Sequence, residues 1–114
     1  AKGDNNFTSA DSLKAVNVDF IAGGANNFTT ADDIQFVNSS FEAKNNNITT
    51  TNDGADVILN NLTIKSATAN PEDTVTKINA KGNVTTKDVT GTATDPYHYK
   101  VHFYTALPDI DINQ

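Results

Sequence analysis

Apolar residues along this chain gather in short clusters, each entered through a polar stretch rich in Asn, Thr and Asp. The first three clusters run over 13–22, 34–43 and 57–65. None is long enough, or periodic enough at 3.6 residues per turn, to predict a helix. Each therefore predicts a short β-strand, and the dipeptides Gly23-Gly24 and Asp53-Gly54 mark turns between strands.

A polar phrase recurs ahead of these clusters. It reads Asn-Asn-Phe-Thr-Ser at 5–9, Asn-Asn-Phe-Thr-Thr at 26–30 and Asn-Asn-Ile-Thr-Thr at 46–50, at steps of 21 and 20 residues. A unit of about 20 residues cannot bury its own apolar face, so it must stack on its neighbours. We expect one all-β domain over 1–114, with repeats at about 5–25, 26–45, 46–66 and 74–94 and non-repeating C-terminal strands over 95–114. Within the fourth repeat, 82–86 echoes the opening phrase.

Two architectures satisfy this pattern. In a short parallel β-solenoid with a C-terminal strand cap, each repeat is one coil, and Asn17, Asn38 and Asn60 or Asn61 recur at one corner, where their side chains bond to one another. In a β-sandwich with strand exchange between subunits, each repeat is an antiparallel pair. The regular spacing favours the solenoid, whereas the non-repeating last fifth favours the sandwich. The stacked core should contain Phe7, Phe20, Phe28, Phe36, Phe41, Ile48, Leu59, Leu62 and Ile64.

The composition supports an all-β chain. It holds 16 Asn and 16 Thr but only 2 Glu, 4 Leu and no Arg, so strand and turn formers dominate over helix formers. The net charge of −6, without a basic run, argues against nucleic acid as a partner. No apolar stretch approaches the roughly 20 residues of a membrane span.

The chain has the features of an exported protein. It begins with Ala and contains no Met, as expected after removal of a signal peptide. The absence of Cys excludes a disulfide framework. Six Asn-x-Ser/Thr sequons offer candidate glycosylation sites at Asn6, Asn27, Asn38, Asn47, Asn61 and Asn83. We therefore expect an extracellular or cell-surface location.

No residue constellation predicts catalysis, a cofactor or a metal site. His98 and His102 lie in an alternating strand, where four residues span about 13 Å, too far to share one ion. Acidic groups at 32–33, 52–56 and 109–111 have oxygen ligands that suit calcium, but a plain turn explains Asp53-Gly54 better. We expect a protein that is not an enzyme.

Threonine files offer the main candidate binding surface. Thr8, Thr29, Thr49 and Thr85 recur at one phase, with Ser9, Thr30, Thr50 and Thr86 beside them. Such files resemble the flat faces of ice-binding β-solenoids, although only one of two adjacent files can face outward. The string Val57-Ile58-Leu59-Asn60-Asn61-Leu62-Thr63-Ile64 resembles, more broadly, the coils of parallel β-helix proteins of cell surfaces. That resemblance covers about 5–90, implies a solenoid fold and carries over no site residues.

These observations predict a secreted structural subunit that pairs with itself into an extracellular filament, pilus-like fibre or sheath. Alternating segments at 14–21 or 101–112 would serve as donor strands, and 109–112 reads as an acidic edge strand. The candidate intersubunit residues are Leu13, Val16, Val18, Phe20, Val101, Phe103, Ile110 and Ile112. The alternative is a cell-surface binding module for glycan, ice or calcium.

Overall fold

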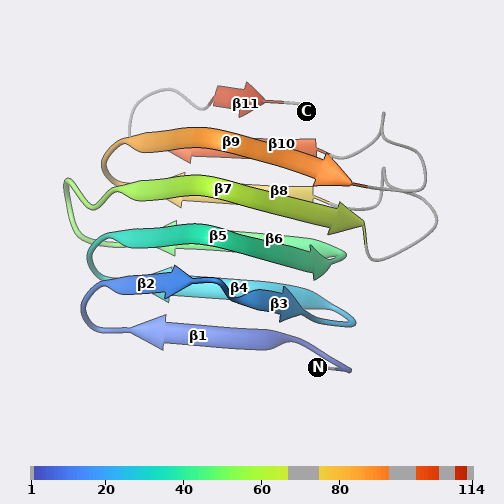
Figure 1. The fold of residues 1–114 in the computed structure, drawn as a ribbon. Coiled ribbons are helices and arrows are strands. Elements are labelled where there is room, and N and C mark those ends of the chain that lie inside the picture. The colour runs from blue at the N-terminus through green and yellow to red at the C-terminus, as the bar shows by residue number, and fades with distance from the viewer. Residues whose placement is uncertain (1, 67–74, 93–99, 106–109, 113–114) are drawn as a thin grey trace.

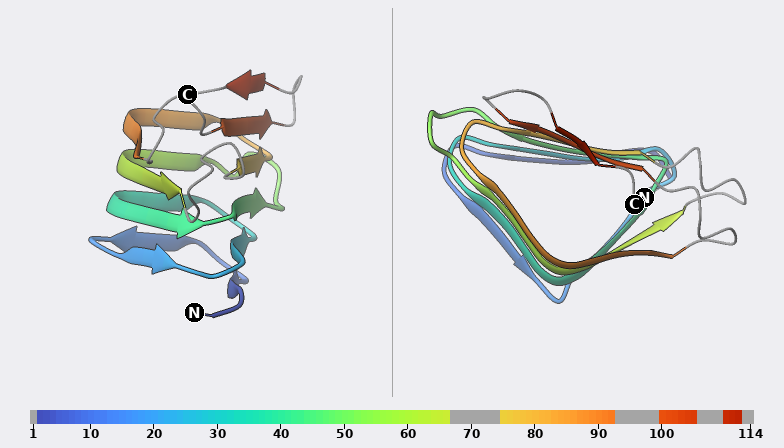
Figure 2. Two further views of the ribbon diagram at one scale, coloured as in Figure 1. Left: turned by 90° about the vertical axis from the view of Figure 1, so that its right-hand side faces the viewer. Right: turned by 90° about the horizontal axis from the view of Figure 1, so that it is seen from above.

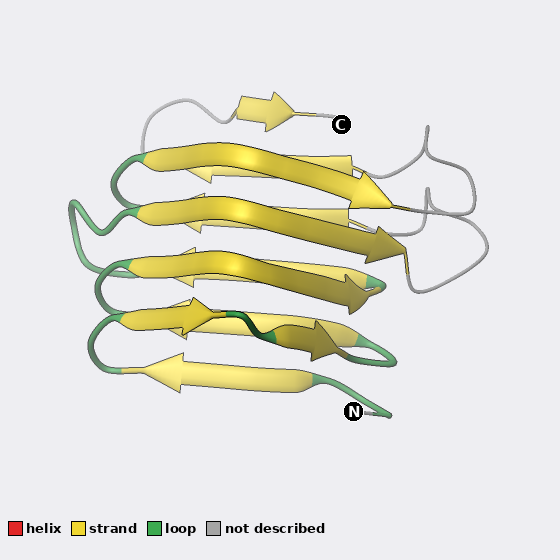
Figure 3. Ribbon diagram, in the orientation of Figure 1, coloured by secondary structure: helices red, strands yellow, loops and turns green. Residues whose placement is uncertain are grey.

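The computed structural model describes residues 2–66, 75–92, 100–105 and 110–112. Within these residues the chain forms eleven β-strands and no helix, which confirms the all-β prediction (Figure 1, Figure 3). The strands lie in two sheets that face each other. Sheet A contains, in spatial order, β1 (Asn5–Ser9), β4 (Ala25–Thr30), β6 (Asn45–Thr50), β8 (Val75–Ala80), β10 (Lys100–Thr105) and β11 (Ile110–Ile112). Sheet B contains β2 (Leu13–Val16) with β3 (Asp19–Ile21), then β5 (Ile34–Ala43), β7 (Val57–Ser66) and β9 (Val84–Thr92).

Successive strands alternate between the two sheets. We call each sheet A strand, together with the sheet B strand that follows it in the chain, a tier: β1 with β2 and β3 form tier 1, β4 with β5 tier 2, β6 with β7 tier 3, and β8 with β9 tier 4. Seen from above, the tiers lie over one another (Figure 2). All pairing between tiers is parallel, and β10 with β11 is the one antiparallel pair among the described strands. The antiparallel units of a β-sandwich are therefore not what the described strands form.

The recurrent Asn-Asn phrases occupy equivalent places in sheet A. Phe7 lies opposite Phe28, and Phe28 lies opposite Ile48, so the first three copies pair residue for residue. The fourth strand of this file is β8, where Ile78 lies opposite Ile48. The segment 82–86, which echoes the phrase in sequence, was assigned wrongly: it enters β9 of sheet B, where Thr85 lies opposite Ile58. The strand of tier 4 that aligns with the phrases in sheet A is the one that carries the buried Ile78, not the one with similar Asn and Thr content.

The core lies between the sheets and is built from inward-facing apolar side chains. Eight of the nine predicted core residues are buried, and Phe7, in tier 1, is partly buried against them. Phenylalanine rings of tiers 1 and 2 pack against one another, most of them edge to face and two pairs stacked. Within tier 2 the ring centroids of Phe28 and Phe36 are 4.8 Å apart, and those of Phe36 and Phe41 are 4.9 Å apart. Such pairs add to the stabilisation from area burial. The core ends on Phe7 at the N-terminal side.

Sheet B bends at residues with positive φ, which lie within β5, β7 and β9 and between β2 and β3. These residues are Asn17, Asn38, Asn61 and Asp88, with φ between 51° and 58°, and they lie in one file across the sheet. Asn and Asp tolerate this left-handed conformation better than other side chains do. The predicted corner therefore exists with Asn61, not Asn60, as its third member, and Asn61 Nδ2 donates to Asn38 Oδ1 at 2.8 Å.

Candidate functional site

The N-terminal end of the stack is the candidate assembly surface. Here β1 is the edge of sheet A, and β2 with β3 is the edge of sheet B. Within 2–65 and 76–89, where side-chain exposure is described, the exposed large apolar residues all lie on this sheet B edge: Val16 (45% exposed), Val18 (36%) and Ile21 (53%). Among the predicted intersubunit residues, Leu13, Val16, Val18 and Phe20 thus lie on an edge, with Leu13 and Phe20 turned toward the core.

The two faces of this edge differ. Val16 aligns with Val37 and Asn60 on the outer side of sheet B. Val18 follows the bend at Asn17 and therefore aligns with Ser39 and the buried Leu62, on the inner side. A strand added along β2 and β3 would bring Val18 into the core but would leave Val16 on the outer surface.

The C-terminal end has a different form. In sheet B the edge is β9, whereas in sheet A β10 lies between β8 and β11, which leaves β11 as the edge. Val101 lies opposite Ile112, and Phe103 lies opposite Ile110. The predicted strand 101–112 therefore forms a hairpin on β8 of the same molecule, and Asp109 lies outside the described residues.

An amide ladder runs through the interior of sheet A. Asn5 Nδ2 donates to Asn26 Oδ1 (3.0 Å), Asn26 Nδ2 to Asn46 Oδ1 (3.0 Å), and Asn46 Nδ2 to Thr76 Oγ1 (3.1 Å). Asn26, Asn46 and Thr76 are buried, so these bonds satisfy groups that water cannot reach. We refer to this file as the inner ladder. This ladder was not expected from the sequence, although the phase of the apolar Phe7 and Phe28 places the first Asn of each phrase on the same inward side.

A second ladder lies on the outer face of sheet A. Asn27 Nδ2 donates to Asn6 Oδ1 at 2.9 Å, and Asn47 Nδ2 donates to Asn27 Oδ1 at 2.8 Å. Three predicted glycosylation residues thus form this outer ladder, whereas Asn38, Asn61 and Asn83 are exposed in sheet B and its turns.

The threonine files are partly as expected. Thr8, Thr29 and Thr49 lie in register on the outer face of sheet A, and the neighbouring file of Ser9, Thr30 and Thr50 faces inward. Thr85 and Thr86 do not join these files, because β9 belongs to sheet B.

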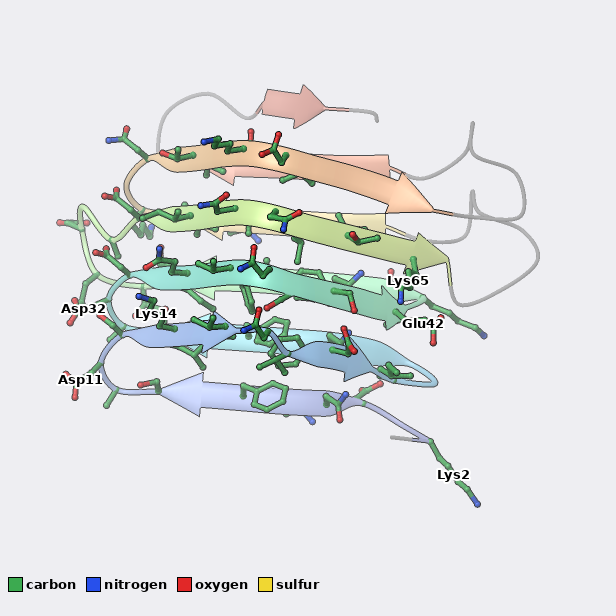
Figure 4. The ribbon with its side chains drawn as sticks, in the orientation of Figure 1. Lys2, Asp11, Lys14, Asp32, Glu42 and Lys65 are labelled. Carbon is green, nitrogen blue, oxygen red and sulfur yellow. The ribbon has the colours of Figure 1, made fainter. Side chains whose placement is uncertain are left out.

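The acidic side chains hold the turns between sheets. Asp33 Oδ1 accepts the backbone N–H of Asp56, and Asp56 Oδ1 accepts that of Asn83, each at 2.7 Å. Asp11 and Asp32 follow one another along these turns (Figure 4), and Asn52 Nδ2 donates to Asp32 Oδ1 at 3.0 Å.

These contacts bear on the candidate metal and binding residues. Gly54, with φ of 79°, is in the turn predicted for Asp53-Gly54. No group of three or more His, Asp or Glu side chains able to hold a metal occurs in the described part of the chain, and His98 lies outside it. The same part of the chain contains no helix that is long and apolar enough to cross a membrane.

Comparison with protein-family models, with curated proteins and with solved structures found no match to this chain. The features that bear on its function are the two sheet edges, the two amide ladders and the stacking of the tiers.

Proposed function

We propose that this chain is a short β-solenoid, with each tier as one coil, that serves as a secreted structural subunit. It pairs with further copies of itself through sheet edges and builds an extracellular filament, pilus-like fibre or sheath. The observation that carries the proposal is the exposed apolar edge of tier 1, where Val16, Val18 and Ile21 lie and where Val18 faces inward with no described strand on its N-terminal side. Elsewhere in 2–65 and 76–89, where side-chain exposure is described, large apolar side chains are turned inward or partly covered.

Edges of this kind favour assembly. Natural proteins usually block an exposed strand with charge, proline or a covering segment, because open N–H and C=O groups recruit other strands. On β2 the one charged side chain, Lys14, aligns with Gln35 and Ile58 on the outer side of sheet B. On β3 the one charged side chain, Asp19, alternates with the inward-facing Phe20, so the inner side of this edge carries no charge. Identical contacts that do not close on themselves generate a fibre.

The alternative is a cell-surface binding module, and one observation favours it. Thr8, Thr29 and Thr49 form a regular outward file beside the outer ladder, which is a flat polar surface of repeated spacing. The file has three described threonines and continues at β8 with Asn79. Self-assembly is the stronger proposal, because pairing of an apolar edge strand removes apolar surface and open backbone groups from water. An exposed threonine file has no comparable gain from being covered.

The proposal is tested by measuring the mass of the 12.2 kDa chain with light scattering over a range of concentrations, together with electron microscopy. We expect multimers, and we expect Val18→Asp to suppress them because the charge enters the inner side of the joint. Val16→Asp is the matched control on the outer side and should leave assembly nearly unchanged. A wild-type chain that stays monomeric at every concentration would contradict the proposal.

A further inference from the structure

We propose that tier 1 of a second copy docks on tier 4, so that its β1 pairs with β8 in the place of β10 while its β2 and β3 pair with β9. This inference rests on the proposed function and specifies which surfaces join, and in which register. Each described tier adds a parallel strand to sheet A and then a parallel strand to sheet B. A second copy entering by its N-terminal end would continue that order.

The register follows from the existing files. Along sheet A, Asn5, Asn26, Asn46 and Thr76 are equivalent, as are Phe7, Phe28, Ile48 and Ile78. The next strand of the same kind would therefore place the second copy's Asn5 against Thr76 and its Phe7 against Ile78. Phe7, which is only partly buried in the single molecule, would then be covered on both sides.

The inner ladder is chemically complementary across this joint. Both Nδ2 hydrogens of Asn5 are used, since this amide donates to Ile21 O and to Asn26 Oδ1, each at 3.0 Å. Its Oδ1 is the acceptor left at the N-terminal end of the ladder. At the other end, Thr76 Oγ1 accepts from Asn46 and retains a hydroxyl hydrogen to donate. Thr76 of one copy would thus donate to Asn5 of the next.

Sheet B gives an independent match. In the register of the existing files, Val89 would meet the second copy's Val18, and Gly91 would meet its Phe20. Val89 is partly buried against the core, so the pair would enclose Val18 in apolar surroundings. Gly91 has no side chain that would oppose the phenylalanine ring.

The bent positions also meet, because Asp88 would face the second copy's Asn17. Within the molecule the corresponding bond is donated by Asn61 to Asn38, toward the N-terminal side. An amide at Asn17 donating to the carboxylate of Asp88 keeps this direction across the joint.

Charges and turns are compatible with this register. The second copy's Lys14 would face Thr85, its Val16 would face Lys87, and its Asp19 would face Thr90, so no two charged side chains are directly opposed.

The turn between the sheets also fits this register. Asn83 occupies the place of Asp33 and Asp56, whose side-chain oxygens accept a backbone N–H of the next tier. Asn83 Oδ1 can accept the N–H of the second copy's Ser12 in the same way.

The hairpin of β10 and β11 competes with the second copy for β8. It pairs with β8 in parallel over six residue pairs, and so occupies the edge that an entering β1 requires. In sheet B, β9 is the edge strand and no described strand covers it. The hairpin therefore limits growth of the stack to molecules in which β10 has left β8.

The first experiment uses the absence of Cys from the chain. In the proposed joint, Lys14 of one copy is the parallel neighbour of Thr85 of another, and paired Cα atoms about 5 Å apart lie within disulfide range. In one molecule the same two positions are three strand spacings apart, or roughly 14 Å, too far for a disulfide. We expect the double variant Lys14→Cys with Thr85→Cys to yield a series of covalent multimers on oxidation.

The control shifts one cysteine along the strand. Lys14→Cys with Lys87→Cys places the thiols two residues out of register, with Cα atoms about 8 Å apart across the joint, and should cross-link far less. If the protein forms multimers but the Lys14→Cys with Thr85→Cys variant forms no disulfide between copies, the proposed joint is overturned while self-assembly stands. Equal cross-linking by both pairs would also overturn the register.

A second experiment releases the hairpin in the full chain. Phe103→Pro removes a ladder donor from β10, so multimers should form at a concentration lower by about tenfold or more. Asp111→Pro weakens only the outer strand β11 and should change that concentration less. If Phe103→Pro leaves assembly unchanged or weakens it, the hairpin is not a competitor and the inference fails. If neither variant nor the wild type forms multimers, the proposed function fails with it.

Discussion

The inner and outer ladders of sheet A place the same amino acid in neighbouring positions of the same strands. Asn26 and Asn27 both take part in amide-to-amide bonds, at 3.0 and 2.9 Å, yet the side chain of Asn26 is fully buried whereas that of Asn27 is partly exposed. Water can replace a lost partner on the outer face. Inside, a lost partner leaves a polar group unsatisfied, which costs more than the bond itself contributes.

The inner ladder also fixes register. A shift of one residue in the pairing of β4 with β6 would carry Asn46 to the outer face and Asn47 into the core. The Phe28 and Ile48 file would move outward at the same time. Burial of both kinds of side chain on one face therefore specifies one alignment of tiers, while the outer ladder follows from it.

The largest expected effect concerns the apolar part of the inner side. Phe41 is buried among three other phenylalanine rings, with centroids 4.9 to 5.8 Å away. Phe41→Ala should lower the free energy of unfolding by about 3 to 5 kcal/mol, since a cavity remains. Val16→Ala, on the exposed side of β2, should change it by less than about 0.5 kcal/mol. Urea titration measures both, and similar losses would mean that the two sides do not differ as described.

Placing a charge on the inner ladder tests the solvent argument directly. Asn46→Asp should lower stability relative to the wild type by roughly 3 kcal/mol at pH 7, because burial removes water from the introduced charge. Burial raises the folded-state pKa of the introduced carboxyl above its ordinary value near 3.9. The deficit should therefore shrink as the pH falls toward the unfolded-state pKa and grow as the pH rises through the folded-state pKa.

Asn47→Asp is the outward control, and it should show a small deficit with little pH dependence. Unfolding is measured for the two variants and the wild type between pH 3.5 and 7. A deficit for Asn46→Asp that stays constant over this range would show that the introduced group is not desolvated.

Alanine substitutions sharpen the comparison without adding charge. Asn46→Ala should cost about 1 to 3 kcal/mol, because it removes the acceptor of the buried Asn26 amide. Asn47→Ala removes an outer amide and should cost about 0.5 kcal/mol or less. Calorimetry of both variants tests the order, and an equal loss would assign the same energetic value to both ladders.

The smallest effect is expected at the bent file of sheet B. Asn61→Ala places a side chain with a Cβ, and no compensating local hydrogen bond, at φ of 54°. Asn61→Gly loses the same bond to Asn38 but adopts this φ readily, so it should be more stable than the alanine variant by about 1 kcal/mol. Chemical denaturation of the two variants measures the difference in their free energies of unfolding, which reports the cost of positive φ for a residue with a Cβ. Equal stabilities would argue against a left-handed conformation at position 61.

Much of the fold could be predicted from local pattern. The apolar clusters identified β2 with β3, β5 and β7, and eight of the nine expected core residues are buried, because the inward phase of a strand is readable from its own sequence. The Asn-Asn stretches were expected as polar entries to these strands, whereas they form β1, β4 and β6 themselves. The repeated phrase correctly aligned β1, β4 and β6. It failed at 82–86, where the Asn and Thr content suggested sheet A but the chain lies in sheet B.

The candidate site was predicted in part. Val16 and Val18 were identified as strand residues able to pair with a neighbour, but a sequence does not reveal which strand ends as an edge. That depends on which strands occupy the flanking positions, and β10, expected to be available, is paired on both sides. The amide of Asn26 was likewise read as part of a polar entry to a strand, although it lies in the core.

The sequence by itself determined an all-β chain, the inward side of most core residues and the equivalence of the first three Asn-Asn phrases, because these depend on local pattern within single segments. The tertiary structure decided that the tiers pair in parallel, that Asn61 rather than Asn60 takes the bend, and that β2 with β3 and β9 are the edges of sheet B. The physical reason is that parallel and antiparallel strands share the same two-residue period. Their partners are selected by contacts between residues 20 or more positions apart, which a local pattern does not contain.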